Sequence, residues 1–294
     1  MGIDKSKKSD LLLLLAAAIW GFAFVAQKIG MDYVGPFTYN GVRFALGALV
    51  LIPFIAFKKN PENIPHPDEK KYLFKGGSIA GVLLFAGVSS QQLGLIYTTA
   101  GNAGFITGLY VVFVPIAGLF LGHKTNWLIW TGVLLAGIGL YCLSVTAYFK
   151  INKGDLLVFI CAIVWTFHVL VIAKYSPLVD TLKLAFIQFV VCSLLCMSFA
   201  FIFDDVSIKG IIDAALPIAY GGLLSVGIAY TLQVFVQKNA HPTAAAIILS
   251  LESVFAAIGG WIFLSEPASL RGIFGAALMF AGMILAQINP RKKL

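Results

Sequence analysis

The sequence predicts an all-α integral membrane protein in which ten transmembrane helices form two inverted five-helix repeats around a central cavity. Sixty per cent of its 294 residues are hydrophobic and only 12% are charged, whereas about a quarter of the residues of soluble domains are charged. The mean hydropathy is +0.92, the apolar residues gather in long runs, and the two halves of the chain resemble each other. Lipid must therefore be the solvent for most of this chain.

Each long apolar run predicts a membrane-spanning helix. The bilayer core offers no water to satisfy backbone groups, so a run of about 20 apolar residues is expected to be helical. The first run continues to about Ile29 without an obvious cleavage site, which favours a spanning helix over a signal peptide. Turn signals such as Gly35-Pro36 and Glu266-Pro267 separate the runs. The expected helices are residues 11–31, 37–57, 76–97, 101–122, 126–146, 155–175, 183–203, 214–237, 243–264 and 270–288.

Lysine and arginine are distributed unevenly among the connecting segments. If the N-terminus faces the cytoplasm, fifteen of the 21 lie in inside segments, five lie in outside segments, and Arg43 lies within a helix. Because cytoplasmic loops are enriched in these residues, both termini are expected to be cytoplasmic. This placement explains the net charge of +8 without a nucleic-acid partner. No organellar targeting segment is visible, so a multi-pass protein of the bacterial inner (plasma) membrane is expected.

An internal repeat relates residues 1–146 to residues 147–294. Trp20 recurs as Trp165 at an offset of 145, and Arg43 has Gln188 as its counterpart at the same offset. With five helices in each half, the second half enters the membrane from the opposite side. Inverted repeats of this kind bind solute near the bilayer midplane and rock between two open states. Glycines of the first half, Gly81, Gly87, Gly132 and Gly139, match Gly221, Gly227, Gly275 and Gly282 of the second.

Motifs in both halves carry a resemblance to a known family. The first half contains Trp20-Gly21-Phe22-Ala23-Phe24, and Ala100-Gly101-Asn102-Ala103-Gly104-Phe105 running on to Tyr110 and Pro115. The second half contains Ala240-His241-Pro242-Thr243-Ala244-Ala245-Ala246, Leu251-Glu252-Ser253-Val254-Phe255 and Leu264-Ser265-Glu266. Over essentially its whole length, the chain resembles the ten-helix, EamA-like members of the drug/metabolite transporter superfamily.

The resemblance implies two packed five-helix bundles around a central cavity and, usually, the export of small metabolites or amino acids. The sequence departs from the family pattern at two places. Ser253 stands where many relatives have proline after the glutamate, and His168 stands where the first half has Ala23. Both departures leave the substrate open.

Three ionisable residues within predicted helices are candidates for function, because charge is costly in the bilayer and usually faces a cavity or a partner. Glu252, near the middle of its helix, would bind an amino group of the substrate or accept a proton; the alternative is a structural hydrogen bond. His168 could take part in proton coupling or be a neutral, hydrogen-bonded histidine of the bundle. Arg43 could snorkel to the surface or pair with an internal acceptor.

Aromatic and amide side chains suggest the walls of a cavity. Trp20 and Trp165 lie about halfway along their helices rather than at the interfaces where tryptophans usually gather. Neutral amides would bind a polar solute without fixed charge, although ordinary packing between helices explains each side chain equally well. The candidate substrate-binding residues are Trp20, Phe24, Gln92, Tyr110, Trp165, His168, Tyr230 and Glu252, with Gln91, Asn102 and Gln233 as further amides.

Small residues and one proline predict details of the helix packing. Glycine pairs spaced four apart, such as Gly104 and Gly108, permit close approach of helices. Pro115 lies near the centre of the predicted helix 101–122 and is expected to kink it, as a hinge or as a static bend.

These features favour a secondary transporter that works by alternating access on a small metabolite or amino acid. The sequence contains no G-x-x-x-x-G-K-[ST] phosphate loop, so an ion gradient, an exchange or the solute's own gradient must drive transport. An intramembrane enzyme would need clustered catalytic groups, but H-E-x-x-H is absent and the four histidines are scattered. A channel or a non-transporting scaffold stays open as an alternative. No metal or cofactor is expected, and the chain could be a monomer or a homodimer.

Overall fold

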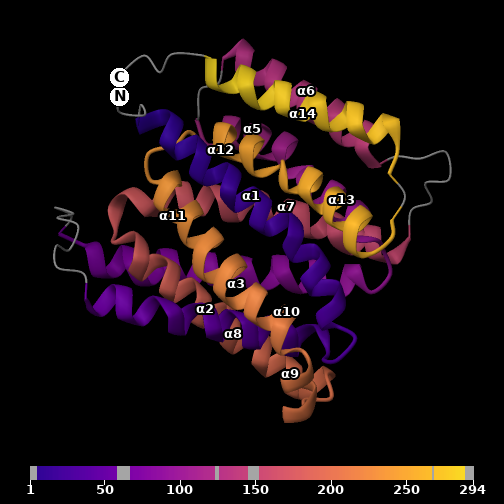
Figure 1. Ribbon diagram of the computed structural model, residues 1–294. Coiled ribbons are helices and arrows are strands. Elements are labelled where there is room, and N and C mark those ends of the chain that lie inside the picture. The colour runs from indigo at the N-terminus through magenta and orange to yellow at the C-terminus, as the bar shows by residue number, and fades with distance from the viewer. Residues whose placement is uncertain (1–4, 58–66, 123–125, 145–151, 267, 289–294) are drawn as a thin grey trace.

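The computed structural model describes residues 5–57, 67–122, 126–144, 152–266 and 268–288 (Figure 1). The described part of the chain is helical and contains no strand. Pro267 lies outside the described residues, as do some of the lysines, arginines and histidines counted in the sequence: Lys58, Lys59, His66, His123, Lys124, Lys150 and residues 291–293.

The first half of the chain contains α1 (Lys5–Gly30), α2 (Pro36–Ala56), α3 (Glu69–Leu95), α4 (Ala100–Gly108), α5 (Tyr110–Phe120) and α6 (Trp127–Ser144). The second half contains α7 (Lys153–Tyr175), the short η1 (Ser176–Leu178), α8 (Thr181–Phe203), α9 (Ile208–Asp213), α10 (Ala215–Ala219), η2 (Tyr220–Tyr230), α11 (Thr231–Gln237), α12 (Pro242–Leu249), α13 (Glu252–Phe263) and α14 (Leu270–Ile288). The helical segment from α10 to α11 passes through η2, which is π-helical.

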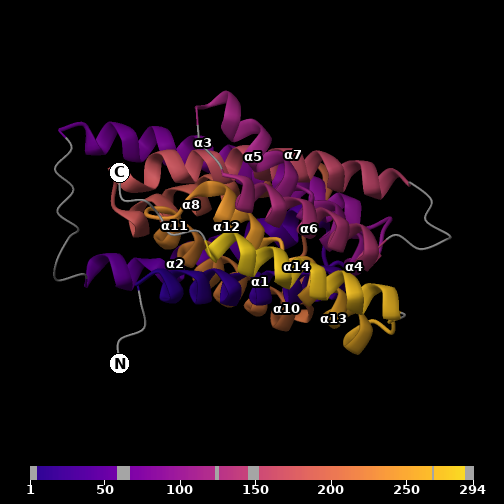
Figure 2. The same ribbon diagram turned by 90° about the horizontal axis from the view of Figure 1, so that it is seen from above.

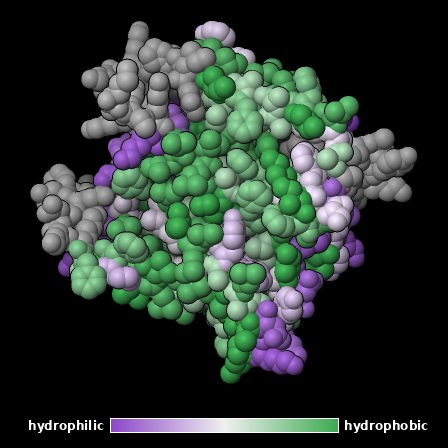
Figure 3. Space-filling model, in the orientation of Figure 1, coloured by the Kyte–Doolittle hydropathy of each residue, from purple (hydrophilic) through white to green (hydrophobic). Residues whose placement is uncertain are grey.

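The described helices are those of a multi-pass membrane protein. Eight helical segments are long and apolar enough to cross a membrane, and α6 and α14 each contain a shorter apolar stretch. Large apolar side chains such as Phe120, Phe201 and Leu216 point outward and are largely exposed. Figure 3 shows a mostly hydrophobic face, with hydrophilic residues gathered toward its margins. Lipid contact makes such a surface stable, whereas a soluble monomer exposes only small apolar patches.

Helices of the two halves pack in matched pairs. The repeat relates α1 to α7, α2 to α8, and α3 to the segment that contains η2. Accordingly, α3 contacts α8 as η2 contacts α2, and α3 contacts α7 as η2 contacts α1. In two further contacts, α2 with α8 and α6 with α14, each helix packs against its own equivalent in the other half. Figures 1 and 2 show that α1 and α7 begin at opposite ends of the bundle, while α14 ends where α1 begins.

Glycines bring α6 and α14 into backbone contact. A Cβ atom at Gly139 would lie 2.5 Å from the carbonyl oxygen of Gly275, and a Cβ at Gly282 would lie 2.6 Å from that of Gly132. Gly104 packs in the same close manner, since a Cβ there would lie 2.7 Å from the Cβ of Ala256. The close helix approach predicted at Gly104 is thereby confirmed.

Two of the predicted helices are interrupted, and one interruption differs from the prediction. The predicted helix 101–122 breaks at Leu109, between α4 and α5, and Pro115 lies inside α5. The helix is therefore interrupted not at Pro115, as expected, but six residues earlier. The N–H that proline lacks would have bonded to the carbonyl of Val111, so Pro115 does not by itself explain the break at Leu109. The predicted helix 243–264 breaks at Ser250 and Leu251, and Glu252 begins α13 rather than lying within a continuous helix.

Candidate functional site

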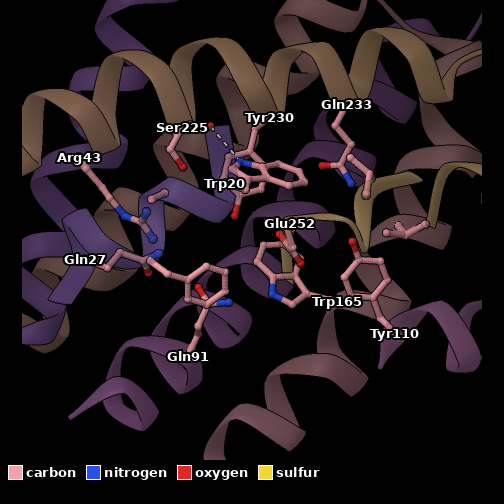
Figure 4. A pocket seen from close by; sticks show the side chains of 14 residues that line it. Trp20, Gln27, Arg43, Gln91, Tyr110, Trp165, Ser225, Tyr230, Gln233 and Glu252 are labelled. Atoms are coloured by element: carbon pink, nitrogen blue, oxygen red, sulfur yellow. Dashed lines mark hydrogen bonds between the residues drawn. The ribbon is translucent and has the colours of Figure 1, made fainter. Parts of the chain in front are cut away.

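A buried cavity lies between the helices of the two halves (Figure 4). Six of the eight candidate residues line it: Trp20, Phe24, Tyr110, Trp165, Tyr230 and Glu252. The other lining residues are Ala23, Gln27, Arg43, Gln91, Val169, Ser225, Gln233 and Leu249. The structure thus brings most of the predicted site together from α1, α5, α7, η2 and α13.

Three aromatic rings form a layer in the cavity. The ring of Tyr230 lies between those of Trp20, at a centroid distance of 4.5 Å, and Trp165, at 5.8 Å and an interplanar angle of 26°. The indole Nε1 of Trp20 donates a hydrogen bond of 3.2 Å to the carbonyl oxygen of Ser225 in η2. Aromatic pairs at such distances contribute about 0.5–1.5 kcal/mol beyond their burial, so the layer holds α1, α7 and η2 in register.

Glu252 is positioned by the break between α12 and α13. The hydroxyl of Ser253 donates a 2.6 Å hydrogen bond to the carbonyl oxygen of Gly104. On α1, Gly21 packs directly against the backbone at Glu252, where a Cβ would lie 2.6 Å from its carbonyl oxygen. These contacts fix the start of α13 against α1 and α4 and direct the carboxyl group into the cavity, as Figure 4 shows.

Tyr110 and Glu252 hold equivalent places in the two halves. Each follows directly on the break in its helix, and the two are 142 residues apart, close to the offsets of the repeat. The Tyr110 hydroxyl approaches the Glu252 carboxyl group closely enough to interact with it, without the geometry of a hydrogen bond. Glu252 forms no ion pair with a described residue.

Arg43 also reaches the cavity, and it does so without an acidic partner. It is 1% exposed, so of the two alternatives for Arg43 the structure excludes snorkelling and shows an internal acceptor: the side chain runs inward from α2. Its Nε donates a 3.0 Å hydrogen bond to Oδ1 of Asn40, whose own Nδ2 donates to the carbonyl oxygen of Val88. The guanidinium carbon lies 5.4 Å and 5.1 Å from the ring centroids of Tyr39 and Phe44. The described residues provide no carboxylate for it.

His168 and Gln92 lie behind the cavity walls rather than on them. His168 is fully buried, its Nε2 lies 2.9 Å from Oε1 of Gln188, and its ring packs edge-on against Trp165. Gln92 donates a 3.1 Å hydrogen bond from Nε2 to the backbone carbonyl of Gln27. Both were predicted to line the cavity, but each lies behind a lining residue. Helical spacing alone does not show which face of a helix is turned to the cavity.

Some lining residues had a sequence signal, and some had none. Ala23 and Gln27 follow Trp20 by three and seven residues, and Val169 follows Trp165 by four, so they share the helix faces of the tryptophans. Ser225 belongs to the π-helical stretch, whose altered periodicity places it outside any α-helical pattern.

The cavity is narrow in this conformation. Its volume is about 30 Å³, which holds a few water molecules at most, whereas small-molecule sites measure about 300–1,000 Å³. A metabolite can therefore bind only when the cavity walls move apart. Within the described ranges, no three His, Cys, Asp or Glu side chains are grouped to hold a metal ion.

The fold and the buried, charged cavity define a multi-pass membrane protein of the transporter class. The model of the EamA-like transporter family matches residues 7–145 and again residues 152–287. The chain therefore belongs to the EamA-like transporter family. Several of its relatives carry the names of transporters or efflux pumps.

Two of these relatives match along almost the whole chain. An uncharacterized transporter of Archaeoglobus fulgidus is 34% identical over 96% of this chain and 86% of its own length. The uncharacterized transporter YoaV of Bacillus subtilis is 23% identical over 95% of this chain and 96% of its own. A probable amino-acid metabolite efflux pump of Escherichia coli is 39% identical over 59 residues, 20% of each chain.

A solved structure shows the same fold. It is described only as the crystal structure of a protein and aligns with a TM-score of 0.78 and 17% identity. The alignment covers 98% of this chain and 100% of the other.

Proposed function

We propose that the protein is a secondary transporter of the plasma membrane that exports small amino-acid-like zwitterions by alternating access. The observation that carries this proposal is the pair of opposite charges on one buried cavity, Arg43 and Glu252, neither of which has an ionic partner among the described residues. A buried charge without a partner is strongly unfavourable, so each implies a ligand group of opposite charge.

A zwitterion supplies both partners at once. Its carboxylate would accept two parallel hydrogen bonds from the Arg43 guanidinium, which Asn40 already orients. Its ammonium group would pair with Glu252, beside the face of the stacked aromatic rings, where cations are stabilised further. Arg43, Glu252 and Tyr230 line the same cavity, so a ligand bound there would face both charged side chains.

Glu252 also provides a route to coupling. A protonated carboxyl group no longer attracts ammonium, so proton and substrate would compete for it. Protons that enter from outside would then displace the substrate outward, which drives export. The name of the E. coli protein that matches 59 residues, a probable amino-acid metabolite efflux pump, supports this direction.

Alternating access rests on two inverted five-helix repeats, residues 1–146 and 147–294, with ten spanning helices and cytoplasmic termini. The opposite entry of α1 and α7 (Figures 1 and 2) and the matched helix contacts support this arrangement. The helix breaks before Tyr110 and Glu252 supply two equivalent places at which the walls can bend. Because the cavity must widen to admit a metabolite, these breaks are the natural hinges.

Counterflow in proteoliposomes tests the proposal. Labelled amino acid outside should accumulate when unlabelled amino acid is inside, which a channel does not produce. Unlabelled amino acids should compete with the labelled one for transport. Their methyl esters, which lack the carboxylate charge, and their N-acetyl derivatives, which lack the ammonium charge, should not. The Arg43→Gln variant should admit methyl esters as well as the parent amino acids, and Arg43→Lys should retain the preference in part. Flux that does not saturate, or equal competition by all three compound classes, would refute the zwitterion site.

A further inference from the structure

A long apolar groove lies on the outside of the bundle, separate from the central cavity. Its walls come from α5 and α7, and the junction of α11 and α12 closes one end. Figure 2 shows α5 close to α7, and the two helices are in contact. The groove has a volume of about 960 Å³. Its lining includes six large apolar side chains: Phe113, Ile116, Phe120, Phe159, Ile163 and Phe167.

Polar groups gather at one end of this groove. Lys174 lies in the last turn of α7 and Lys238 directly follows α11. Between them in the lining is Gln237, which is 1% exposed. Neither its amide nitrogen nor its amide oxygen has a hydrogen-bond partner in the described part of the chain. An unsatisfied buried amide is costly.

We propose that this groove binds one anionic phospholipid, with an acyl chain along the aromatic walls and the phosphate at Lys174, Lys238 and Gln237. The charge distribution predicts that this end of the groove is cytoplasmic, and lysines near that surface attract anionic lipids. The phosphate oxygens accept charge-assisted hydrogen bonds from both lysines and a further bond from the Gln237 amide. The buried amide thereby gains the partner that the protein does not provide.

The dimensions of the groove fit an acyl chain. From Phe159 to Lys174, α7 rises about 22 Å at 1.5 Å per residue, which exceeds half of the roughly 30 Å hydrocarbon core. A chain that starts at the lysines can therefore run along the groove through its whole leaflet. Because α5 and α7 also carry Tyr110 and Trp165 of the cavity, the bound lipid would contact two helices whose movement opens it.

Native mass spectrometry of the full-length protein tests the lipid site, with phosphatidylglycerol and phosphatidylcholine of identical acyl chains as probes. Wild type should retain phosphatidylglycerol preferentially. Lys174→Gln/Lys238→Gln should lower its affinity on the order of thirtyfold, about fivefold for each lysine, and leave phosphatidylcholine unchanged. Lys75→Gln/Lys183→Gln is the charge-matched control, because both lysines are exposed, are predicted to lie on the same side and are absent from the groove lining.

Equal retention of the two lipids by wild type, or the same loss in the control pair, would overturn the proposal. A second variant tests the acyl chain independently: Ala117→Trp fills the groove and leaves the lysines in place. It should release phosphatidylglycerol, whereas 50-fold excess inorganic phosphate should not. Displacement of the lipid by phosphate alone would contradict a site that binds the acyl chain. A homodimer that contains no lipid and that Ala117→Trp dissociates would show that a second copy of the chain occupies the groove instead.

Discussion

Arg43 and Gln188 occupy equivalent positions in the two halves but have different partners. A Cβ at Gly221 would lie 3.0 Å from Cδ of Arg43, and a Cβ at Gly81, the counterpart of Gly221, would lie 3.0 Å from the carbonyl oxygen of Gln188. Gln188 is engaged by His168. The residue equivalent to His168 is Ala23, which lines the cavity and leaves the Arg43 guanidinium open to it.

Replacing Ala23 with His should therefore close the carboxylate end of the cavity. The imidazole would occupy the space beside Arg43, as His168 does beside Gln188, and we expect the KM for counterflow to rise at least tenfold. His168→Ala serves as the matched change, because it removes a side chain that does not line the cavity. It should lower the unfolding temperature, because the Gln188 amide loses its partner, which costs about 1–3 kcal/mol of unfolding free energy. It should leave the KM nearly unchanged. Equal effects on KM would disprove the asymmetry.

Glu252→Gln should uncouple transport from protons. The wild-type efflux rate should increase when the outside of proteoliposomes is made acidic, because protonation of Glu252 from that side releases the ammonium group. The amide can neither take up a proton nor pair with ammonium, so the variant should show at least a tenfold lower rate with no response to the gradient. Glu252→Asp, which keeps the charge, is the control. Unchanged pH-dependent flux in Glu252→Gln would exclude the coupling role.

Substitutions of the two tryptophans should have different effects: Trp165→Ala should change substrate preference, and Trp20→Phe should lower stability. Trp165→Ala removes the ring stacked on Tyr230 and widens the cavity, so larger apolar amino acids should gain relative to small ones. Trp20→Phe keeps a ring but loses the hydrogen bond to the Ser225 carbonyl, at about 0.5–1.5 kcal/mol of stability. A competition panel and thermal unfolding measure the two effects. Identical kinetics across the panel would remove Trp165 from the binding surface.

Gly139→Val should weaken the contact of α6 with α14. The valine Cβ would meet the backbone of Gly275, and overpacking of this kind typically costs about 1–3 kcal/mol. Gly137→Ala on the same helix is the control, since a Cβ there would lie 3.6 Å from its nearest neighbour, an ordinary contact. Thermal unfolding in detergent should separate the two variants; similar unfolding temperatures would argue against a tight seam.

Cysteine labelling should place the beginnings of the two halves on opposite sides of the membrane. Lys8 and Lys153 are exposed, so cysteines introduced there, one at a time, should react with a membrane-impermeant maleimide only from inside and only from outside, respectively. The native Cys142 is replaced by Ser in both variants, because it alone of the four cysteines is not fully buried. Labelling of both positions from one side would exclude an inverted repeat.

The sequence was informative wherever the cause of a feature is local. Apolar run length predicted the spanning helices, and the equal spacing of Trp20 and Trp165 predicted that they meet at one cavity. The break at Leu109 and the π-helical stretch from Tyr220 to Tyr230 depend on contacts between distant segments, such as the hydrogen bond from Ser253 to Gly104 and that from Trp20 to Ser225. Such contacts leave no periodic signal in a single sequence.

The same limit applies to the site. Glu252 was recognisable because a carboxyl group within an apolar run is rare. Sequence spacing could not separate Gln91, which lines the cavity, from its neighbour Gln92, which bonds to the Gln27 backbone. Adjacent residues on a helix face about 100° apart, and only the packed bundle determines which of them points inward.

The seam between α6 and α14 is self-complementary: Gly139 meets Gly275 as Gly282 meets Gly132. A shorter ancestral polypeptide carrying only one such glycine face could have joined a second, oppositely oriented copy of itself through the same surface. Gene duplication and fusion would then have linked two pre-existing partners covalently. After that event the copies were free to diverge, one acquiring an arginine and the other a histidine–glutamine pair at corresponding positions.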